Sequence, residues 1–373
     1  MKKVVFLTGT RADFGKIKSL ISILESNGKF EVFVFVTGMH LQQEYGYTLI
    51  EIERCQFKNI HTFENHTHET TMDLTLAKTI EGFSAYVKSI QPDLIIVHGD
   101  RVETLAGAIV GSLNNILVAH IEGGEISGTV DELIRHSVSK LSHIHFVSNE
   151  KAAKRLVQMG EMKESIFTIG SPDIDIMFSD DLPELRQVKQ YYEIPFEDYA
   201  IVMFHPVTTE ISQMKSYVTN FVKVLLDDHH NYVVIFPNND LGSQMIIEAY
   251  DALKVHSRFR IFPSLRFEYF LTLLKNSQFI IGNSSAGIRE APYYGIPIVN
   301  IGTRQKNRVI DADIVNVDYD IESIMKGLNN IDEHSVQVNS VDFGKGNSAS
   351  LFLDFMKMDS IWNVDKQKQF RDK

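Results

Sequence analysis

The feature that most constrains this chain is an alternation of short apolar runs with longer amphipathic stretches, which occurs twice along the sequence. In the first half, the expected strands are Val4–Thr8, Val32–Val36, Leu94–Val97, Leu117–Ile121 and Ile144–Val147. The expected helices between them are Gly15–Glu25, Met72–Ile90 and Val102–Leu113. Continuous apolar strands that alternate with helices are typical of a parallel sheet covered on both faces.

The second half repeats this pattern. Its expected strands are Ala200–Phe204, Tyr232–Phe236, Arg260–Phe262, Phe279–Ile281 and Pro297–Ile301. Its expected helices are Thr209–Asp227, Ser243–Lys254 and Arg266–Asn276. We therefore predict an α/β protein with two Rossmann-like, doubly wound domains facing a central cleft, which is where a ligand binds in such folds.

The predicted domain boundary lies where Gly, Pro and acidic residues replace apolar periodicity, at Gly170–Asp173 and Ser179–Pro183. A chain of 373 residues is long enough for two such domains. We place the first domain at residues 1–171 and the second at 172–359. The tail is again helical in pattern from Ser348 to Trp362, and we expect a C-terminal helix at 360–373 to join the first domain.

Composition excludes several classes of function. The formal net charge is −11 and no basic cluster with interleaved aromatic residues occurs, so we expect no nucleic-acid partner. The apolar run Val4–Leu7 is too short for a signal peptide or a membrane span, and Cys55 is the only cysteine. We therefore expect a cytoplasmic protein without disulfides or a membrane partner, in which Cys55 packs at a helix end rather than acting as a nucleophile.

Polar clusters follow several of the predicted strands, at the position where open α/β sheets bind ligands. They are Gly9–Asp13, His98–Arg101, His120–Glu125, His205–Thr209 and Gly282–Gly287. Neither G-x-G-x-x-G nor G-x-x-x-x-G-K-[ST] occurs in the chain, which argues against a nicotinamide cofactor and against an ATPase. We expect no cofactor.

These clusters and two further segments resemble hydrolysing UDP-N-acetylglucosamine 2-epimerases. The segments that carry the resemblance are Thr8–Gly15, His98–Arg101, His120–Glu125, Asp131–His136, Phe204–Glu210, Asn283–Pro292 and Gly302–Gln305. That family includes the bacterial enzymes that open sialic-acid synthesis and the epimerase half of the bifunctional animal enzyme. The resemblance covers nearly the whole chain, but the kinase half of the animal enzyme has no counterpart here.

The resemblance implies a GT-B architecture, a homodimer, and UDP bound mainly by the second domain. Ser284 and Ser285 would hold the pyrophosphate with their hydroxyls and the N–H groups of the helix that they open. Glu290 would accept hydrogen bonds from the ribose. The residues expected near the phosphates are Arg11, Arg304 and His205.

The chemistry explains why such an enzyme needs carboxylates. The proton on C2 of an N-acetylhexosamine becomes removable once the C1–O bond to UDP breaks and positive charge builds on the ring, so a base must stand at C2. Asp131 is our candidate for this base. Glu122 would stabilise the ring cation or return a proton, and Asp100 would orient the sugar or serve in hydration.

Further sugar-binding candidates are Asp13, His40 and Arg101. Several of the site residues also have a purely structural interpretation. Four of them could simply be helix N-caps, namely Ser284, Ser285, Asp100 and Asp131. Arg11 could simply form a local ion pair with Asp13. The segment with His61, His66, His68 and Glu69 lacks helical ligand spacing, so we expect a loop over the sugar rather than a metal site.

Three alternative functions remain open from the sequence. The chain could be a non-hydrolysing epimerase that interconverts UDP-sugars. It could be a hydrolysing epimerase for a UDP-2,4-diacetamido or GDP-linked sugar, because one or two pocket contacts decide the sugar. A GT-B glycosyltransferase or a binding protein could use the same scaffold, since fold does not determine function.

Overall fold

The computed structural model describes residues 1–66, 71–127, 129–180, 182–305, 314–331 and 343–369. The chain divides into two compact units, which are treated separately below. Unit 1 comprises Met1–Glu125, Asp131–Ser179 and Val341–Lys373, and unit 2 comprises Ile126–Val130 and Asp180–Ser340. The division after Ser179 differs from the boundary expected at residue 171, because α7 (Pro172–Met177) packs with α1 (Arg11–Asn27) and α14 (Ser348–Met356) in unit 1.

Unit 1 contains a seven-stranded sheet of order β3-β2-β1-β4-β5-β6-β7, in which every pairing is parallel. The strands are β1 (Lys2–Thr8), β2 (Phe30–Val36), β3 (Ile60–Thr62), β4 (Leu94–His98), β5 (Leu117–Ile121), β6 (Ile144–Val147) and β7 (Ile166–Thr168). All five strands predicted in this half are confirmed, and their residues form the centre of a largely buried core.

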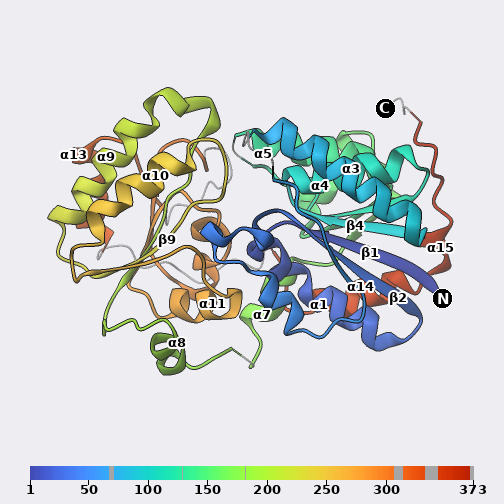
Figure 1. Cartoon of the computed structure of the whole chain (residues 1–373), viewed down its shortest axis with the longest axis horizontal. Coiled ribbons are helices and arrows are strands. Elements are labelled where there is room, and N and C mark those ends of the chain that lie inside the picture. Colours follow the sequence, from blue (N-terminus) through green and yellow to red (C-terminus); the bar gives the residue numbers. More distant parts are fainter. Residues whose placement is uncertain (67–70, 128, 181, 306–313, 332–342, 370–373) are drawn as a thin grey trace. The chain divides into compact units, whose positions relative to one another are not determined.

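Helices cover both faces of this sheet (Figure 1). On one face, α1 and α14 pack against each other and bury apolar side chains of β1 and β2 in a common core. On the other face lie α3 (Met72–Ile90), α4 (Val102–Leu113) and α5 (Val130–Leu141). The remaining helices of unit 1 are α2 (Leu49–Glu53), α6 (Glu150–Gln158) and α15 (Asp359–Trp362), with short 3-10 helices at Gly38–Leu41, Gln43–Tyr45 and Lys163–Ser165.

Unit 2 contains a six-stranded sheet of order β10-β9-β8-β11-β12-β13, again with parallel pairings throughout. Its strands are β8 (Ala200–Met203), β9 (Tyr232–Ile235), β10 (Phe259–Phe262), β11 (Ile280–Gly282), β12 (Ile298–Ile301) and β13 (Ile314–Val317). The five strands predicted in this half are confirmed to within a residue or two. The prediction of two parallel α/β folds is therefore confirmed.

The helices of unit 2 also form two layers (Figure 1). One layer holds α9 (Ile211–Asp227), α10 (Ser243–Tyr250) and α13 (Ile321–Asn329), and its core includes the fully buried Phe204 and Phe221. The opposite face carries α8 (Leu185–Tyr191), α11 (Phe267–Lys275) and the short α12 (Ala286–Arg289). The 3-10 helices of this unit are Thr208–Glu210, Asp251–Leu253 and Ala291–Tyr294.

The C-terminal segment belongs to unit 1, and the expected helix at 360–373 is wrong over most of its length. The helix ends at Trp362, and the described residues that follow form no further helix. Lys368 holds this segment instead, because its ammonium donates to the Ser142 carbonyl at 2.6 Å and to the Glu161 carboxylate at 2.5 Å. Residues 370–373 lie outside the described part of the chain. No helix in the described residues is long and apolar enough to cross a membrane.

Glu161 is the centre of this buried ionic cluster, and its contacts predict how the free energy of unfolding depends on pH. Its carboxylate accepts from Lys140 at 2.7 Å and lies 3.1 Å from His145 Nε2. Burial alone raises the pKa of Glu161, but the hydrogen bonds and charges of His145, Lys140 and Lys368 outweigh burial and lower the pKa to about 2. A lowered folded-state pKa stabilises the fold above the unfolded-state value of 4.5, and this contribution disappears as pH falls towards 2.

We therefore expect Glu161→Gln to reduce the free energy of unfolding by about 2–3 kcal/mol at pH 7, with a difference from wild type that shrinks between pH 4.5 and 2. Denaturant unfolding at several pH values measures this difference. Glu51→Gln is the control, because Glu51 forms an exposed 3.0 Å ion pair with Arg54 whose loss costs below about 1 kcal/mol. An equal, pH-independent loss in both variants contradicts the prediction.

Candidate active site

The five polar clusters each begin within two residues of the end of a strand. Thr8, His98 and Ile121 are the last residues of β1, β4 and β5, which are adjacent parallel strands. The turns after these strands therefore lie along one side of the sheet, which we call the carboxyl edge. His205 and Asn283 stand at the corresponding edge of unit 2, after β8 and β11.

Asp100 and Glu122 are brought together at the carboxyl edge of unit 1 by Arg135. The Arg135 guanidinium donates one hydrogen bond to Asp100 Oδ2 and another to the Glu122 carbonyl at 2.5 Å. Arg135 is almost fully buried, and its charge stands between the turns that follow β4 and β5. The arginine balances the Asp100 charge and ties the two turns into one constellation.

Asp131 joins this constellation through its helix. It lies in the first turn of α5, four residues before Arg135. Residues four apart share one face of a helix, so Asp131 and Arg135 face the same way. The side chain of Asp131 is half-buried, which leaves a carboxylate at the carboxyl edge with access to a ligand.

Glu122 has an unusually well-defined environment. Its backbone has a φ of 64°, a left-handed conformation that is rare for a glutamate, and its side chain is almost fully buried. Oε1 accepts from Ser171 Oγ at 2.5 Å and lies 3.7 Å from Lys16 Nζ. Oε2 lies 3.4 Å from His98 Nε2. Such a residue is held in one orientation by groups from several elements.

The turn that carries Asp100 is itself supported by a buried histidine. His120 Nε2 lies 2.8 Å from the Gly99 carbonyl and Nδ1 lies 3.0 Å from Ser139 Oγ. Burial lowers the pKa of His120 to about 3, so the ring is neutral and serves to shape the turn. Arg101 is the N-cap residue of α4 and is half-buried, directly after Asp100.

Asp13 and His40 occupy structural positions near the end of β1. Asp13 completes a capping box with Thr10 at the start of α1, and burial raises its pKa against the hydrogen bonds from Thr8 and Gly9. His40 is fully buried, with Thr8 Oγ1 at 3.0 Å and Thr48 Oγ1 at 2.6 Å from its two ring nitrogens. Burial lowers the pKa of His40 to about 3. Their predicted sugar contacts stay a prediction, as does the role of the half-buried Arg11, the first residue of α1.

Asn283 organises the carboxyl edge of unit 2. Its side chain accepts from the His205 N–H at 2.6 Å and donates to the His205 carbonyl at 2.9 Å. Its own carbonyl accepts from Arg304 Nη1 at 3.2 Å and from the Gln305 amide at 2.7 Å. His205 Nδ1 accepts from the Asn238 N–H at 3.2 Å, so the proton of the neutral ring stands on Nε2. One asparagine thus connects three of the polar segments of this unit.

The residues predicted to bind the pyrophosphate follow Asn283 directly in the sequence. Ser284 and Ser285 lie between β11 and α12, and Ser284 Oγ accepts from the Ala286 N–H at 3.2 Å. Glu290 is the C-cap residue that follows α12 and is almost fully buried. The turn requires Gly282, since its φ is 138° and an added Cβ would stand 2.0 Å from the Met203 carbonyl oxygen.

Several residues of these sites were not predicted individually. Arg135, His98 and Asn283 stood within the segments that carried the family resemblance. Ser171 stood only within the predicted domain boundary, and Glu103 did not stand out at all. Glu103 is almost fully buried and fills the space beside two glycines, because a Cβ on Gly9 or Gly38 would stand within 3 Å of it. The sequence signal for Glu103 was its position five residues after a strand, which a pattern alone does not distinguish from a helix carboxylate.

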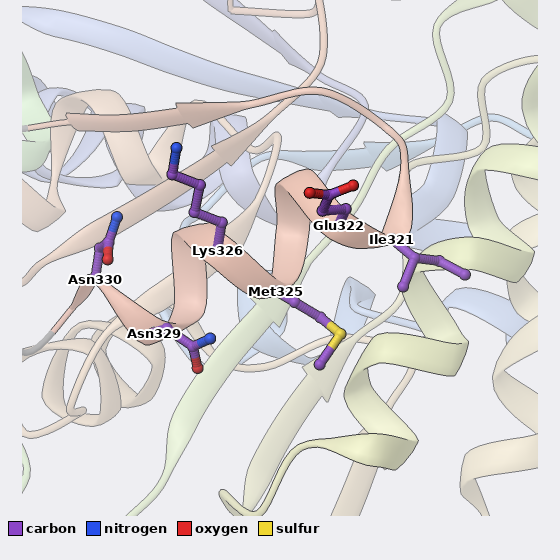
Figure 2. A pocket seen from close by; sticks show the side chains of 6 residues that line it. All are labelled: Ile321, Glu322, Met325, Lys326, Asn329 and Asn330. Carbon is purple, nitrogen blue, oxygen red and sulfur yellow. The ribbon is translucent and has the colours of Figure 1, made fainter.

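Other polar groups in the structure do not form a comparable site. His66 Nδ1 lies 2.5 Å from the Gln42 amide, while His68 and Glu69 lie outside the described residues. Within the described residues, the side chains of Asp228, His229 and His230 lie close enough together to hold a metal ion, but His229 is largely exposed. Figure 2 shows a surface hollow whose lining comes from α13 and Asn330, and it contains none of the predicted site residues.

Two parallel α/β units, each with polar side chains gathered at the carboxyl ends of its strands, define a protein of the GT-B fold class. A solved structure of Methanocaldococcus jannaschii UDP-GlcNAc 2-epimerase in complex with UDP-GlcNAc and UDP superposes with a TM-score of 0.79 at 21% identity, covering 95% of this chain and 99% of that one. The sequence profile of UDP-N-acetylglucosamine 2-epimerases matches residues 22–357. The chain belongs to the UDP-N-acetylglucosamine 2-epimerase family.

Curated relatives extend this result over the full length. The chain is 46% identical to a UDP-N-acetylglucosamine 2-epimerase of Neisseria meningitidis serogroup B, covering 100% of this chain and 99% of that one. It is 34% identical to the hydrolysing UDP-N,N'-diacetylbacillosamine 2-epimerase of Legionella pneumophila, covering 88% of each. It is 31% identical to polysialic acid biosynthesis protein P7 of Escherichia coli, covering 100% of this chain and 97% of that one.

Proposed function

We propose that this protein is a hydrolysing UDP-N-acetylglucosamine 2-epimerase that converts UDP-N-acetylglucosamine and water into N-acetylmannosamine and UDP. The product suits the first step of sialic acid synthesis for a surface glycan. The similarity to a polysialic acid biosynthesis protein supports this pathway, and the similarity to an epimerase described as hydrolysing supports this branch. By the same resemblance we propose a cytoplasmic homodimer, and light scattering of the purified protein tests its mass.

The observation that carries the proposal is the gathering of Asp100, Glu122 and Asp131 around Arg135. Arg135 contacts the first two directly and shares a helix face with the third. A sugar that loses its leaving group becomes cation-like, and carboxylates stabilise such charge. Elimination also needs a base at C2, and a half-buried carboxylate on this edge can serve.

The proposed reaction begins when the C1–O bond breaks and its electron pair leaves with UDP. Asp131 takes the C2 proton, so that a C1–C2 double bond forms and 2-acetamidoglucal results. Water then adds its hydroxyl to C1 while a proton returns to C2 from the opposite face. In this scheme Glu122 stabilises the cation and Asp100 orients the sugar or assists hydration, and no cofactor takes part.

Unit 2 is proposed to bind the leaving UDP. His205, Ser284, Ser285 and Arg304 would contact the phosphates and Glu290 the ribose, with Arg11 of unit 1 as a further phosphate ligand. The support is that Asn283 fixes the backbone of His205 and the guanidinium of Arg304 at one strand end. Donors and cations that are held rigidly bind a pyrophosphate without a further ordering cost.

We predict that Asn283→Ala weakens UDP binding by about 10- to 100-fold, because the His205 backbone loses both of its hydrogen bonds to the Asn283 side chain. Isothermal titration of UDP into wild type and variant measures this change. Asn231→Ala is a matched control, since the Asn231 amide donates to Asp198 on the surface of the same unit. Equal UDP affinity in Asn283→Ala and wild type contradicts the assignment.

A second candidate function is a hydrolysing epimerase for a diacetamido sugar, favoured by the 34% identity to the Legionella pneumophila enzyme. A substrate panel separates the possibilities. The protein, treated with a chelator, is incubated with UDP-N-acetylglucosamine, its 4-acetamido analogue and the GDP-linked analogue, and nucleotides and sugars are separated. We expect the fastest release of UDP, with N-acetylmannosamine, from the first donor. Epimerised but intact UDP-sugar indicates the non-hydrolysing branch, and release that needs an acceptor indicates a glycosyltransferase.

A further inference from the structure

Glu122 is contacted from the start of a helix that lies where the sequence predicted a domain boundary and that has no part in the proposed chemistry. Helix α7 begins at Pro172, and its N-cap residue is Ser171. Ser171 is fully buried and donates from Oγ to Glu122 Oε1 at 2.5 Å across 49 positions of sequence. The Ser171 N–H donates to the Phe343 carbonyl at 2.6 Å, so the backbone that carries this hydroxyl is itself held.

Asp173, two residues further along, acts on the same carboxylate through a lysine. Its side chain is fully buried and its Oδ2 lies 3.0 Å from Lys16 Nζ. Lys16 Nζ lies 3.7 Å from Glu122 Oε1, and the Lys16 side chain is 12% exposed. A buried ammonium between two carboxylates is confined to a narrow position, because leaving either one exposes an uncompensated charge to the protein interior.

We propose that Ser171 and Asp173 are positioning residues for Glu122 in the reaction. Ser171 fixes Oε1 directly, and Asp173 holds Lys16 where its charge favours the ionised carboxylate. The proposal rests on the proposed function, in which Glu122 stabilises the ring cation, and it selects that role over the return of a proton.

The charges around Glu122 support the ionised form. Lys16 approaches from α1 and Arg135 from α5, where its guanidinium donates to the Glu122 carbonyl. His98, at the end of β4, stands 3.4 Å from Oε2. The opposing negative charges are Asp173, which pairs with Lys16, and Asp100, which pairs with Arg135. Each nearby cation and the Ser171 hydroxyl stabilise the carboxylate over the carboxylic acid.

The first test is Ser171→Ala, with release of UDP measured from pH 5 to 9. Removing a hydrogen bond to a carboxylate favours its protonated form. We expect kcat to fall about 10- to 100-fold, KM to change by less than about threefold, and the acid limb of the kcat/KM profile to move up by about one pH unit. Ser171→Cys, with a weaker donor of similar size, is expected to shift the limb in the same direction by less.

Asp173→Asn tests the second residue. Without the Asp173 charge Lys16 is no longer held beside Glu122, so the ionised carboxylate loses a stabilising cation, the acid limb is expected to move up and kcat to fall. Asp175→Asn on the same helix is the matched control. Asp175 accepts from the N–H groups of Ser348 and Ala349 at 2.8 Å, so its loss is expected to lower stability but leave the pH profile unchanged.

The outcomes separate this proposal from the proposed function. If wild type releases UDP but Ser171→Ala and Ser171→Cys keep the wild-type pH profile, the positioning role is wrong and the function stands. The same holds if Asp175→Asn shifts the profile as much as Asp173→Asn, because the effect is then structural. If wild type turns over no nucleotide sugar, the proposed function itself is wrong. If wild type is active but Glu122→Gln keeps full activity, the role of Glu122 is wrong and the positioning role is wrong with it.

Discussion

Glu122→Gln is expected to lower kcat for UDP release by about 10²- to 10⁴-fold while the protein remains folded. The substitution keeps the shape of the side chain but removes the negative charge that faces the developing sugar cation. Its partners make the loss specific, because Ser171 and Lys16 stand at Oε1 and are suited to a carboxylate rather than an amide. Steady-state kinetics with UDP-N-acetylglucosamine measures the change, and circular dichroism checks the fold.

Glu150→Gln is the control for this experiment. Glu150 lies on the same unit, where its carboxylate accepts from Thr168 Oγ1 at 2.9 Å in an exposed position. Its substitution is expected to leave kcat within a factor of about two, since exposed polar contacts contribute little. If Glu122→Gln and Glu150→Gln have similar kcat values, Glu122 has no part in the chemistry.

The second large effect is expected from Arg135→Met, which removes the cation between the turns of Asp100 and Glu122. The variant leaves Asp100 without the guanidinium and the Glu122 carbonyl without its 2.5 Å donor. Breaking a buried pair by removing one partner costs about 3–5 kcal/mol. We therefore expect a loss of stability of this size and, because both turns are released, a loss of nearly all turnover.

Denaturant unfolding and kinetics are measured together on this variant. The control is Arg54→Met, which removes a guanidinium from an exposed 3.0 Å pair with Glu51, and we expect a change below about 1 kcal/mol. An Arg135→Met protein that is as stable and active as Arg54→Met would show that Arg135 does not organise the site.

The strands were predictable because a parallel sheet buries both faces and leaves an unbroken apolar run in the sequence. Val4–Thr8 and Leu117–Ile121 are examples, and both are fully buried strands of the centre of the sheet. The strands that the pattern missed, β3, β7 and β13, lie at the edges of their sheets. They are short and half-exposed, so their apolar signal is weak.

The candidate site was predictable only in part, because its contacts depend on the order of the strands in the sheet. Motif positions identified Asp100, Glu122 and Asp131, because each lies just after a strand or opens a helix. The contacts between these residues depend on which strands are neighbours. Ser171 reaches Glu122, and Arg135 reaches Asp100, only because β4, β5 and the start of α7 meet in the folded unit. No local pattern in the sequence encodes such a pairing.

The central claim is elimination followed by hydration, and proton NMR in deuterated water tests it most directly. The purified protein is incubated with UDP-N-acetylglucosamine without added metal or nucleotide cofactor. The account predicts free UDP together with N-acetylmannosamine that carries deuterium at C2, since the proton that returns to C2 comes from solvent. Free UDP with an N-acetylmannosamine that keeps its original C2 proton, or an equilibrium of intact UDP-sugars without free UDP, would contradict it.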